Sequence, residues 1–315
     1  MTKENLLTFG PVPSRRLGRS LGINNIPPKS CSYSCIYCQL GRTLNMQAKR
    51  RVFYNPDELL QAVEKKVKVA KNKGEPIDYF TFVPDGEPTM DVNLGKVIKL
   101  FRPMGIKIAV ISNASFIWQK DVQDDLCKAD WVSLKIDAVS EDVWRKIDRP
   151  HKSLQHDKIL QGITEFSHIF TGKLVTETML IQKVNDTVHE VEKIAGFIGG
   201  LKNVKSYISI PTRPPAEKWV KSAYEHIVNR AYQKFKEKSI DTEYLIGYEG
   251  NAFAFSGNVE EDLLSITSVH PMRKEAVDEF LKKANGNWTI IEKLIAKNKL
   301  IKVEYKGNRF YMRKI

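Results

Sequence analysis

Three cysteines lie within eight residues of one another, at Cys31, Cys35 and Cys38. Cysteine thiolates hold iron–sulfur clusters, and a 4Fe–4S cube has four irons. Three protein ligands would therefore leave one iron free to bind another molecule. In a cytosolic chain such a grouping indicates a metal-binding or catalytic site rather than a disulfide framework.

A structural zinc centre is the alternative use of the same thiols, and it would need a fourth protein ligand. The nearest downstream histidine is His151, and Cys127 falls on a predicted helix. We expect Cys127 to be a small buried apolar residue of that helix rather than a ligand.

Further polar residues come directly after predicted β-strands. In a parallel α/β protein the carboxyl ends of the strands meet at one edge, where ligands bind. We therefore expect the cysteine loop to share that edge with Asp85-Gly86-Glu87, Ser112-Asn113, Asp137 and Asn185-Asp186.

Near-continuous apolar runs alternate with longer amphipathic stretches over about 220 residues. The pattern predicts a parallel sheet covered by helices, either open or closed into a full or partial barrel. The predicted strands are Leu21–Ile26, Asp78–Val83, Lys107–Ser112, Trp131–Asp137, Leu174–Ile181 and Ser206–Ile210. The predicted helices cover about 55–73, 94–104, 120–129, 153–170, 188–201 and 215–239.

The chain divides into four predicted segments: a leader over residues 1–20, a barrel over 21–240, a connector over 241–257 and a basic unit over 258–315. The last segment reads as two helices followed by a hairpin that turns at 306–309, which is the outline of a winged helix. Its short length predicts that it packs on the main domain. We expect Trp288, Phe310 and Tyr311 to form its small core.

The string Cys31-Ser-Tyr-Ser-Cys35-Ile-Tyr37-Cys38 resembles the signature of the radical SAM superfamily, with an aromatic residue before the third cysteine. The resemblance covers about residues 10–215 and implies a partial (β/α)6 TIM-like barrel. It also implies a 4Fe–4S cluster on Cys31, Cys35 and Cys38, whose open iron binds S-adenosylmethionine. Reductive cleavage of this cosubstrate would give methionine and a 5′-deoxyadenosyl radical that abstracts hydrogen from a substrate.

The same resemblance implies a set of cofactor contacts. Gly86 and Glu87 resemble the motif that receives the methionine ammonium, and Ser112-Asn113 a polar pair that contacts the ribose or carboxylate. Asn185 resembles a residue that touches adenine. Ser133, Lys135 and Asp137 alternate along one strand and so are expected to share one face. The full set of expected cofactor contacts is Tyr37, Gly86, Glu87, Ser112, Asn113, Ser133, Asp137 and Asn185.

Within the superfamily, Ser133-Leu-Lys-Ile-Asp137-Ala and Arg149-Pro150-His151 resemble the wyosine-synthase branch, which modifies tRNA. The segment from Gly10 to Ile23 resembles an uncharacterised group related to that branch. Lys135 would then be catalytic, either as a Schiff-base lysine or, as we prefer, as a clamp on the carboxylate of the cosubstrate. Arg15, Arg16 and Arg213 are expected to bind substrate phosphate or carboxylate groups.

The composition is that of a globular protein, with 42% hydrophobic and 28% charged residues, and no apolar run long enough to cross a bilayer. No signal peptide is visible, so we expect a cytoplasmic protein. The net charge of +13 favours an anionic partner such as tRNA or another RNA. A protein or peptide substrate, and a zinc-containing nucleic-acid-binding module without catalysis, are the alternatives. The resemblance implies reduced ferredoxin or flavodoxin as electron donor.

Overall fold

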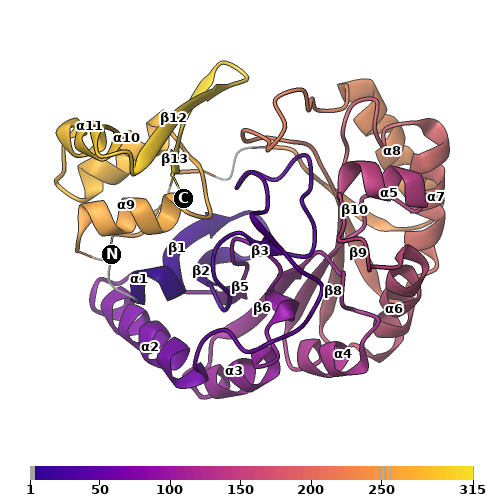
Figure 1. Ribbon diagram of the computed structural model, residues 1–315, viewed down its shortest axis with the longest axis horizontal. Coiled ribbons are helices and arrows are strands. Elements are labelled where there is room, and N and C mark those ends of the chain that lie inside the picture. Colours follow the sequence, from indigo (N-terminus) through magenta and orange to yellow (C-terminus); the bar gives the residue numbers. More distant parts are fainter. Residues whose placement is uncertain (1–3, 248–249, 252, 256, 315) are drawn as a thin grey trace.

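The computed structural model describes residues 4–247, 250–251, 253–255 and 257–314. Their strands form an eight-stranded sheet, a three-stranded sheet and a two-stranded ribbon. Helices run around the outside of the large curved sheet, and the C-terminal unit packs beside its first strand (Figure 1).

The large sheet has the strand order β1-β2-β5-β6-β7-β8-β9-β10. Neighbouring strands from β2 to β10 are parallel, whereas β1 is antiparallel to β2. The strands are β1 (Thr8–Ser14), β2 (Gly18–Ile23), β5 (Tyr79–Phe82), β6 (Lys107–Ser112), β7 (Trp131–Lys135), β8 (Lys173–Met179), β9 (Val204–Ser209) and β10 (Asp241–Leu245). The prediction of a mostly parallel α/β fold is confirmed.

Helices connect the parallel strands, as parallel pairing requires. They are α2 (Pro56–Asn72), α3 (Leu94–Phe101), α4 (Lys120–Leu126), α5 (Glu141–Ile147), α6 (His156–Ile169), α7 (Val188–Gly199) and α8 (Glu225–Glu237). The shorter elements are α1 (Glu4–Leu7), η1 (Pro88–Met90) and η2 (Arg102–Met104). Helix α2 begins as its sequence predicts: the Asn55 side chain accepts a hydrogen bond from the Asp57 backbone N–H at 3.0 Å, and Pro56 occupies the first turn.

The inner face of the sheet is layered. An apolar layer at the base contains Ala109, Trp131, Val175 and Tyr207, closed from the ends by Leu17 and Leu245. Two residues further along β7, β8 and β9 the inner positions are polar, with Ser133, Glu177 and Ser209. Since side chains alternate along a strand, these polar groups share the face of the apolar layer and lie above it.

Two edge strands differ from our expectations. Residues 1–20 were expected to form a leader, and 241–257 a connector, but β1 and β10 pair at the two edges of the sheet. Neither strand is evident from its sequence. Strand β1 contains Pro11 and Pro13, and prolines fit only in an edge strand or at a bulge. In β10, only Thr242 and Leu245 are buried.

The C-terminal unit contains α9 (Val259–Thr267), β11 (Met272–Arg273), α10 (Lys274–Lys283), α11 (Trp288–Ala296), β12 (Leu300–Tyr305) and β13 (Asn308–Arg313). Its strands pair antiparallel in the order β11-β13-β12. Its hydrophobic core includes Phe9 and Val12 of β1, and Ser265 Oγ donates to the Thr8 carbonyl at 3.0 Å. The unit therefore packs on the main domain, as expected. Phe310 and Tyr311 are buried as expected, and Trp288 is half-buried against this core. The winged-helix assignment stays a prediction.

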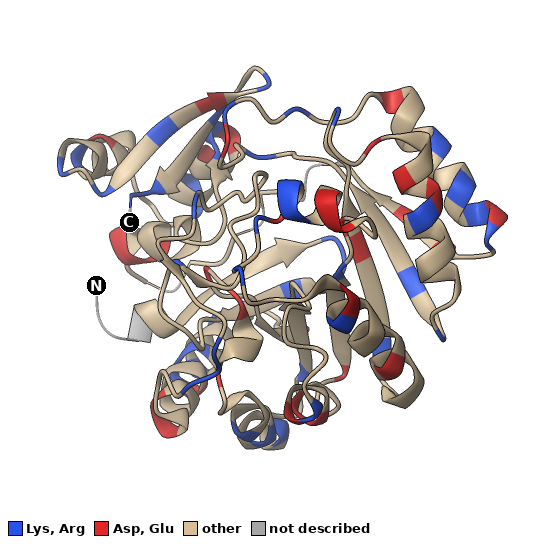
Figure 2. Cartoon of the chain, turned by 45° about the vertical axis from the view of Figure 1, so that its right-hand side comes forward, with Lys and Arg blue, Asp and Glu red and all other residues tan. Residues whose placement is uncertain are grey.

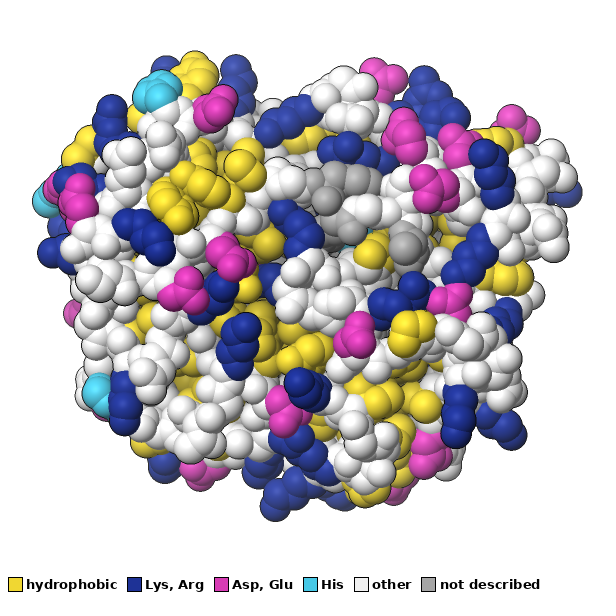
Figure 3. Space-filling model, turned by 180° about the vertical axis from the view of Figure 1, so that it is seen from behind, with side chains coloured by type: hydrophobic (Ala, Val, Ile, Leu, Met, Phe, Trp, Pro, Cys, Tyr) yellow, Lys and Arg dark blue, Asp and Glu magenta, His cyan; other side chains and the backbone are white. Residues whose placement is uncertain are grey.

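Basic and acidic residues are distributed along the outer helices and the β12–β13 hairpin (Figure 2). On the face opposite to that of Figure 1, basic and acidic side chains are interspersed rather than gathered in one patch (Figure 3). None of the described helices combines the length and the apolar character needed to cross a membrane.

Candidate active site

The three cysteines of the 31–38 loop line one cavity of about 310 Å³. Cys31 ends the short strand β3 (Ser30–Cys31), which pairs with β4 (Asn45–Met46). Tight turns follow, since the Cys38 N–H donates to the Cys35 carbonyl and the Gly41 N–H to the Cys38 carbonyl, both at 3.1 Å. These turns direct the three side chains to the same hollow.

Burial raises the pKa of each of the three thiols. Cys35 Sγ donates to Asp148 Oδ1 at 3.2 Å, and the buried Asp148 carboxylate raises the pKa of Cys35 further. Three partly buried thiols that converge on one cavity fit a cationic iron cluster, which would compensate the thiolate charges.

A single-ion zinc centre fits less well. Among the residues that the structure describes, no three His, Cys, Asp or Glu side chains are grouped closely enough to hold one metal ion. A 4Fe–4S cube does not require its cysteines to converge on one ion, because each cysteine binds a different iron. The donor set therefore fits the cluster better than the zinc alternative.

Gly86 holds the loop after β5 against the cysteine loop. Its φ of 152° lies outside the range that other residues favour, and a Cβ there would stand 1.8 Å from the Ser30 carbonyl oxygen. The Glu87 N–H donates to that same carbonyl at 3.3 Å. Only glycine allows this approach, so the residue brings Glu87 next to the base of the cysteine loop.

The Glu87 carboxylate links β5 to the end of β6. Its Oε1 accepts hydrogen bonds from Thr89 Oγ1 at 2.6 Å and Ser112 Oγ at 2.8 Å, and its Oε2 accepts one from the Asn113 N–H at 2.7 Å. Burial raises the pKa of Glu87, and these donors oppose the rise. Asn113 Nδ2 in turn approaches Cys31 Sγ at 3.6 Å. The structure thus brings together the predicted residues Glu87, Ser112 and Asn113, and each lines the cavity.

A buried charge cluster forms the opposite wall. Glu177 of β8 pairs with Arg16 at 2.7 Å and with Lys135 at 3.1 Å, and Ser209 Oγ donates to it at 3.0 Å. Burial alone would raise the pKa of Glu177, but the two cations lower it to about 2. Sequence reasoning missed Glu177, although a lone carboxylate within the apolar run 174–181 was a visible signal.

Lys135 lines the cavity with its Nζ 5.0 Å from the centroid of the Tyr37 ring. Burial acts to lower the pKa of Lys135, but the Asp137 and Glu177 carboxylates outweigh it and raise the pKa. A lysine that stays protonated suits a carboxylate clamp and not a free nucleophilic amine.

Three of the expected cofactor contacts lie outside the cavity lining, namely Ser133, Asp137 and Asn185. Asp137 accepts hydrogen bonds from the Tyr37 hydroxyl and from the Met179 N–H. Asn185 Nδ2 donates to the carbonyls of Asp137 and Met179, both at 2.8 Å, and its Oδ1 accepts from Ile181 N–H. In this structure the two side chains brace the ends of β7 and β8, so their expected contact with cofactor stays a prediction.

The arginines Arg15, Arg16 and Arg213 all line the cavity. Arg15 donates to the Leu245 carbonyl at 3.3 Å, which joins the β1–β2 turn to the last strand. Arg213 Nη1 donates to Gln39 Oε1 at 2.5 Å, and its Nη2 lies 3.0 Å from Nε2 of His270 in the C-terminal unit. Their expected role in binding substrate stays a prediction.

Cys127 differs from our expectation. Its side chain is exposed and does not line the cavity, because it caps the C-terminal end of α4 instead of facing the core. It is therefore neither a buried packing residue nor near the three clustered thiols.

Comparisons with known proteins agree with this geometry. A family model described as the radical SAM superfamily matches residues 25–198. The chain is 48% identical over 311 residues to UPF0026 protein MJ1312 of Methanocaldococcus jannaschii, a match that covers 98% of this chain and 96% of that protein. A UPF0026 protein of Helicobacter pylori strain J99 is 34% identical over 232 residues, with 72% and 74% of the two chains covered.

Solved structures share the fold. A radical SAM methyltransferase from Sphaerobacter thermophilus superimposes with a TM-score of 0.53 at 16% identity, covering 72% of this chain and 66% of the other. The structure of TYW1 with a lysine-pyruvate adduct bound gives a TM-score of 0.50 at 17% identity, covering 70% and 73%.

Proposed function

We propose a reaction from one premise: the chain belongs to the radical SAM superfamily. It is accordingly an enzyme, and we infer that its cosubstrate is S-adenosylmethionine and its cofactor a 4Fe–4S cluster. When bound, the cluster supplies the electron that splits the cosubstrate into methionine and a 5′-deoxyadenosyl radical, which abstracts hydrogen from the substrate. The observation that carries the proposal is the convergence of Cys31, Cys35 and Cys38 on one cavity.

The chain's own residues then have separate tasks. Cys31, Cys35 and Cys38 hold the cluster. Glu87 Oε2 accepts one hydrogen bond where Oε1 accepts three, so it has capacity left for the ammonium of the cosubstrate. Across the cavity Lys135 offers a cation for the carboxylate.

We propose an RNA nucleoside as the substrate. The excess of 50 basic over 37 acidic residues favours a polyanion over an ordinary peptide. Reduced ferredoxin or flavodoxin is proposed as the electron donor.

Two measurements test this function. Anaerobic reconstitution with iron and sulfide, followed by dithionite and S-adenosylmethionine, is expected to give 5′-deoxyadenosine detectable by mass spectrometry. If added S-adenosylmethionine leaves the electron paramagnetic resonance spectrum of the cluster unchanged, the proposal that one iron is open to this cosubstrate is wrong. Mass mapping of RNA nucleosides from a deletion strain tests the substrate: a nucleoside must be lost and must return on complementation. If the change appears only in a protein, the RNA proposal is wrong.

A further inference from the structure

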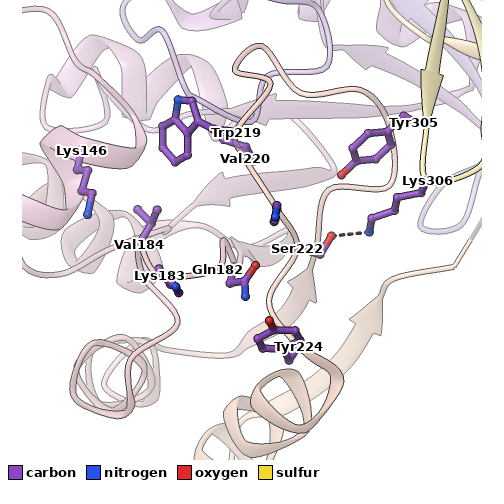
Figure 4. A pocket seen from close by; sticks show the side chains of 11 residues that line it. Lys146, Gln182, Lys183, Val184, Trp219, Val220, Ser222, Tyr224, Tyr305 and Lys306 are labelled. Atoms are coloured by element: carbon purple, nitrogen blue, oxygen red, sulfur yellow. Dashed lines mark hydrogen bonds between the residues drawn. The ribbon is translucent and has the colours of Figure 1, made fainter.

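A second and larger cavity, of about 720 Å³, lies outside the candidate active site. Its lining comes from α5, from the loop between β8 and α7, from the segment after β9 and from the tip of the β12–β13 hairpin. These residues are Lys146, Gln182, Lys183, Val184, Trp219, Val220, Lys221, Ser222, Tyr224, Tyr305 and Lys306 (Figure 4). We call it the outer cavity. Its volume falls within the range of about 300–1,000 Å³ that is usual for ligand sites.

The lining of the outer cavity is basic. It contains four lysines and no aspartate or glutamate. Over the described part of the chain, the salt bridges include none made by Lys146, Lys183 or Lys221, and all three side chains are exposed. Three unneutralised ammonium groups around one hollow attract an anion with several charges.

Two aromatic side chains are exposed in the same cavity. Trp219 is 50% and Tyr224 is 60% accessible to solvent, and both stand on the segment after β9. Figure 4 places them at opposite ends of the Val220–Ser222 stretch, with Gln182 between them. Exposed aromatic rings beside lysines are typical of surfaces that bind single-stranded nucleic acid, where the rings stack on bases and the lysines neutralise phosphates.

The segment between β9 and α8 is shared by both cavities. Thr212 and Arg213 line the candidate active site, whereas Trp219 to Ser222 line the outer cavity. We call residues 210–222 the partition segment. A polymer in the outer cavity therefore lies one chain segment away from the cluster loop.

Contacts from both sides hold the partition segment in place. From the hairpin, Tyr305 Oη donates to the Pro211 carbonyl at 3.2 Å, and Lys306 Nζ donates to Ser222 Oγ at 2.5 Å. From the barrel side, Glu217 pairs with Arg42 at 2.9 Å and with Arg149 at 2.6 Å. Glu217, the acidic residue of this segment, is thus neutralised, and the wall that carries Trp219 is braced.

We propose that the outer cavity binds a single-stranded stretch of the RNA substrate, with bases stacked on Trp219 and Tyr224 and phosphates on Lys146, Lys183 and Lys221. The inference rests on the proposed function, because it takes RNA as the substrate. It adds the place where the strand enters: the outer cavity positions the RNA, and the target nucleoside reaches past the partition segment to the cluster.

The test measures binding of a fluorescein-labelled 12-nucleotide single-stranded RNA to the full-length holoenzyme by anisotropy, between 50 and 200 mM salt. The triple variant K146A/K183A/K221A is expected to bind at least tenfold more weakly at 50 mM salt. Its slope of log Kd against log salt should fall by about 2, since each single-strand phosphate contact contributes about 0.7. W219A is expected to lose about tenfold, the order of one stacked base.

Matched controls use exposed residues on other faces. The triple variant K68A/K96A/K99A removes three exposed lysines of α2 and α3, and W118A removes a tryptophan that is 43% exposed. Both controls should bind RNA like the wild type. Thermal unfolding of every variant checks that the fold is intact.

The outcomes separate the two proposals. If the wild type and both outer-cavity variants bind the RNA equally well, the outer cavity is not the RNA-binding site, and the proposal of an RNA substrate is unaffected. If the wild type binds no RNA at 50 mM salt, the RNA substrate itself is wrong and the site with it. If polyglutamate displaces the RNA as well as polyuridylate of equal charge does, or W219A binds normally, stacking is absent and the inference is overturned in favour of an acidic protein partner.

Discussion

Arg16 and Glu177 form an ion pair of 2.7 Å between residues that are 161 positions apart in the sequence. Arg16 stands in the β1–β2 turn, and its guanidinium also lies over the rings of Trp131 at 5.4 Å and Tyr207 at 5.8 Å. The pair therefore joins the first edge of the sheet to its middle, directly above the apolar layer that closes the barrel.

Replacing Glu177 by glutamine should destabilise the protein by about 3 kcal/mol at pH 7. The change leaves two buried cations, Arg16 and Lys135, without their shared anion, and breaking a buried pair is costly. Urea unfolding of the two proteins measures the loss. Glu141→Gln is the control, because Glu141 makes an exposed pair with Arg145 within one helix and its loss should cost less than about 0.5 kcal/mol. Equal losses in the two variants would contradict the role of Glu177.

The stability difference between wild type and Glu177→Gln should depend on pH. The folded-state pKa of Glu177 is depressed from 4.5 to about 2, so its charge stabilises the fold above pH 4.5. This contribution is lost as the pH falls from about 4.5 to about 2. Unfolding midpoints recorded over that range should converge at the acidic end, and a constant gap would show that the charge of Glu177 is not responsible.

Cys35→Ala should abolish both the cluster and the cleavage of S-adenosylmethionine. Cys35 lies in the middle of the three thiols and lines the cavity. Iron and sulfide content, visible absorption and 5′-deoxyadenosine formation after reconstitution measure the effect. Cys127→Ala should behave as the wild type in all three, because Cys127 is exposed and outside the cavity. Full cleavage by the Cys35 variant would refute its assignment as a ligand.

Gly86→Ala should lower the free energy of unfolding by more than about 2 kcal/mol and weaken binding of S-adenosylmethionine. The new Cβ would lie 1.8 Å from the Ser30 carbonyl oxygen, so the loop that carries Glu87 must move. Gly74→Ala is the matched control, since Gly74 also has a positive φ, of 66°, but nothing lies within 4 Å of an added Cβ. Its cost should be about 1 kcal/mol, without an effect on binding.

Local sequence patterns predicted the parts of the site that lie close together in the chain. The cysteine spacing and the Gly86-Glu87 step each specify a loop at the end of a strand, and both loops meet in one cavity. The central strands were predictable because buried parallel strands are apolar throughout.

Features that depend on distant pairing were not predictable in this way. Strand β1 can contain prolines because it lies at the edge of the sheet. The buried carboxylate of Glu177 is stabilised by Arg16 and Lys135, which are distant in the sequence. The outer cavity arises where the hairpin tip reaches the segment after β9, so no single stretch of sequence encodes it. Asn185 and Asp137 show the opposite case: their positions after the strands were predicted, but in the structure both side chains brace strand ends.

The partition segment presents different side chains to the two cavities that it separates. Thr212 and Arg213 on its inner side line the candidate active site. On its outer side Trp219 and Lys221 are exposed, and Val220 between them is buried in the core of the main domain. Replacing Trp219 or Lys221 would therefore change the lining of the outer cavity without altering any residue that lines the candidate active site.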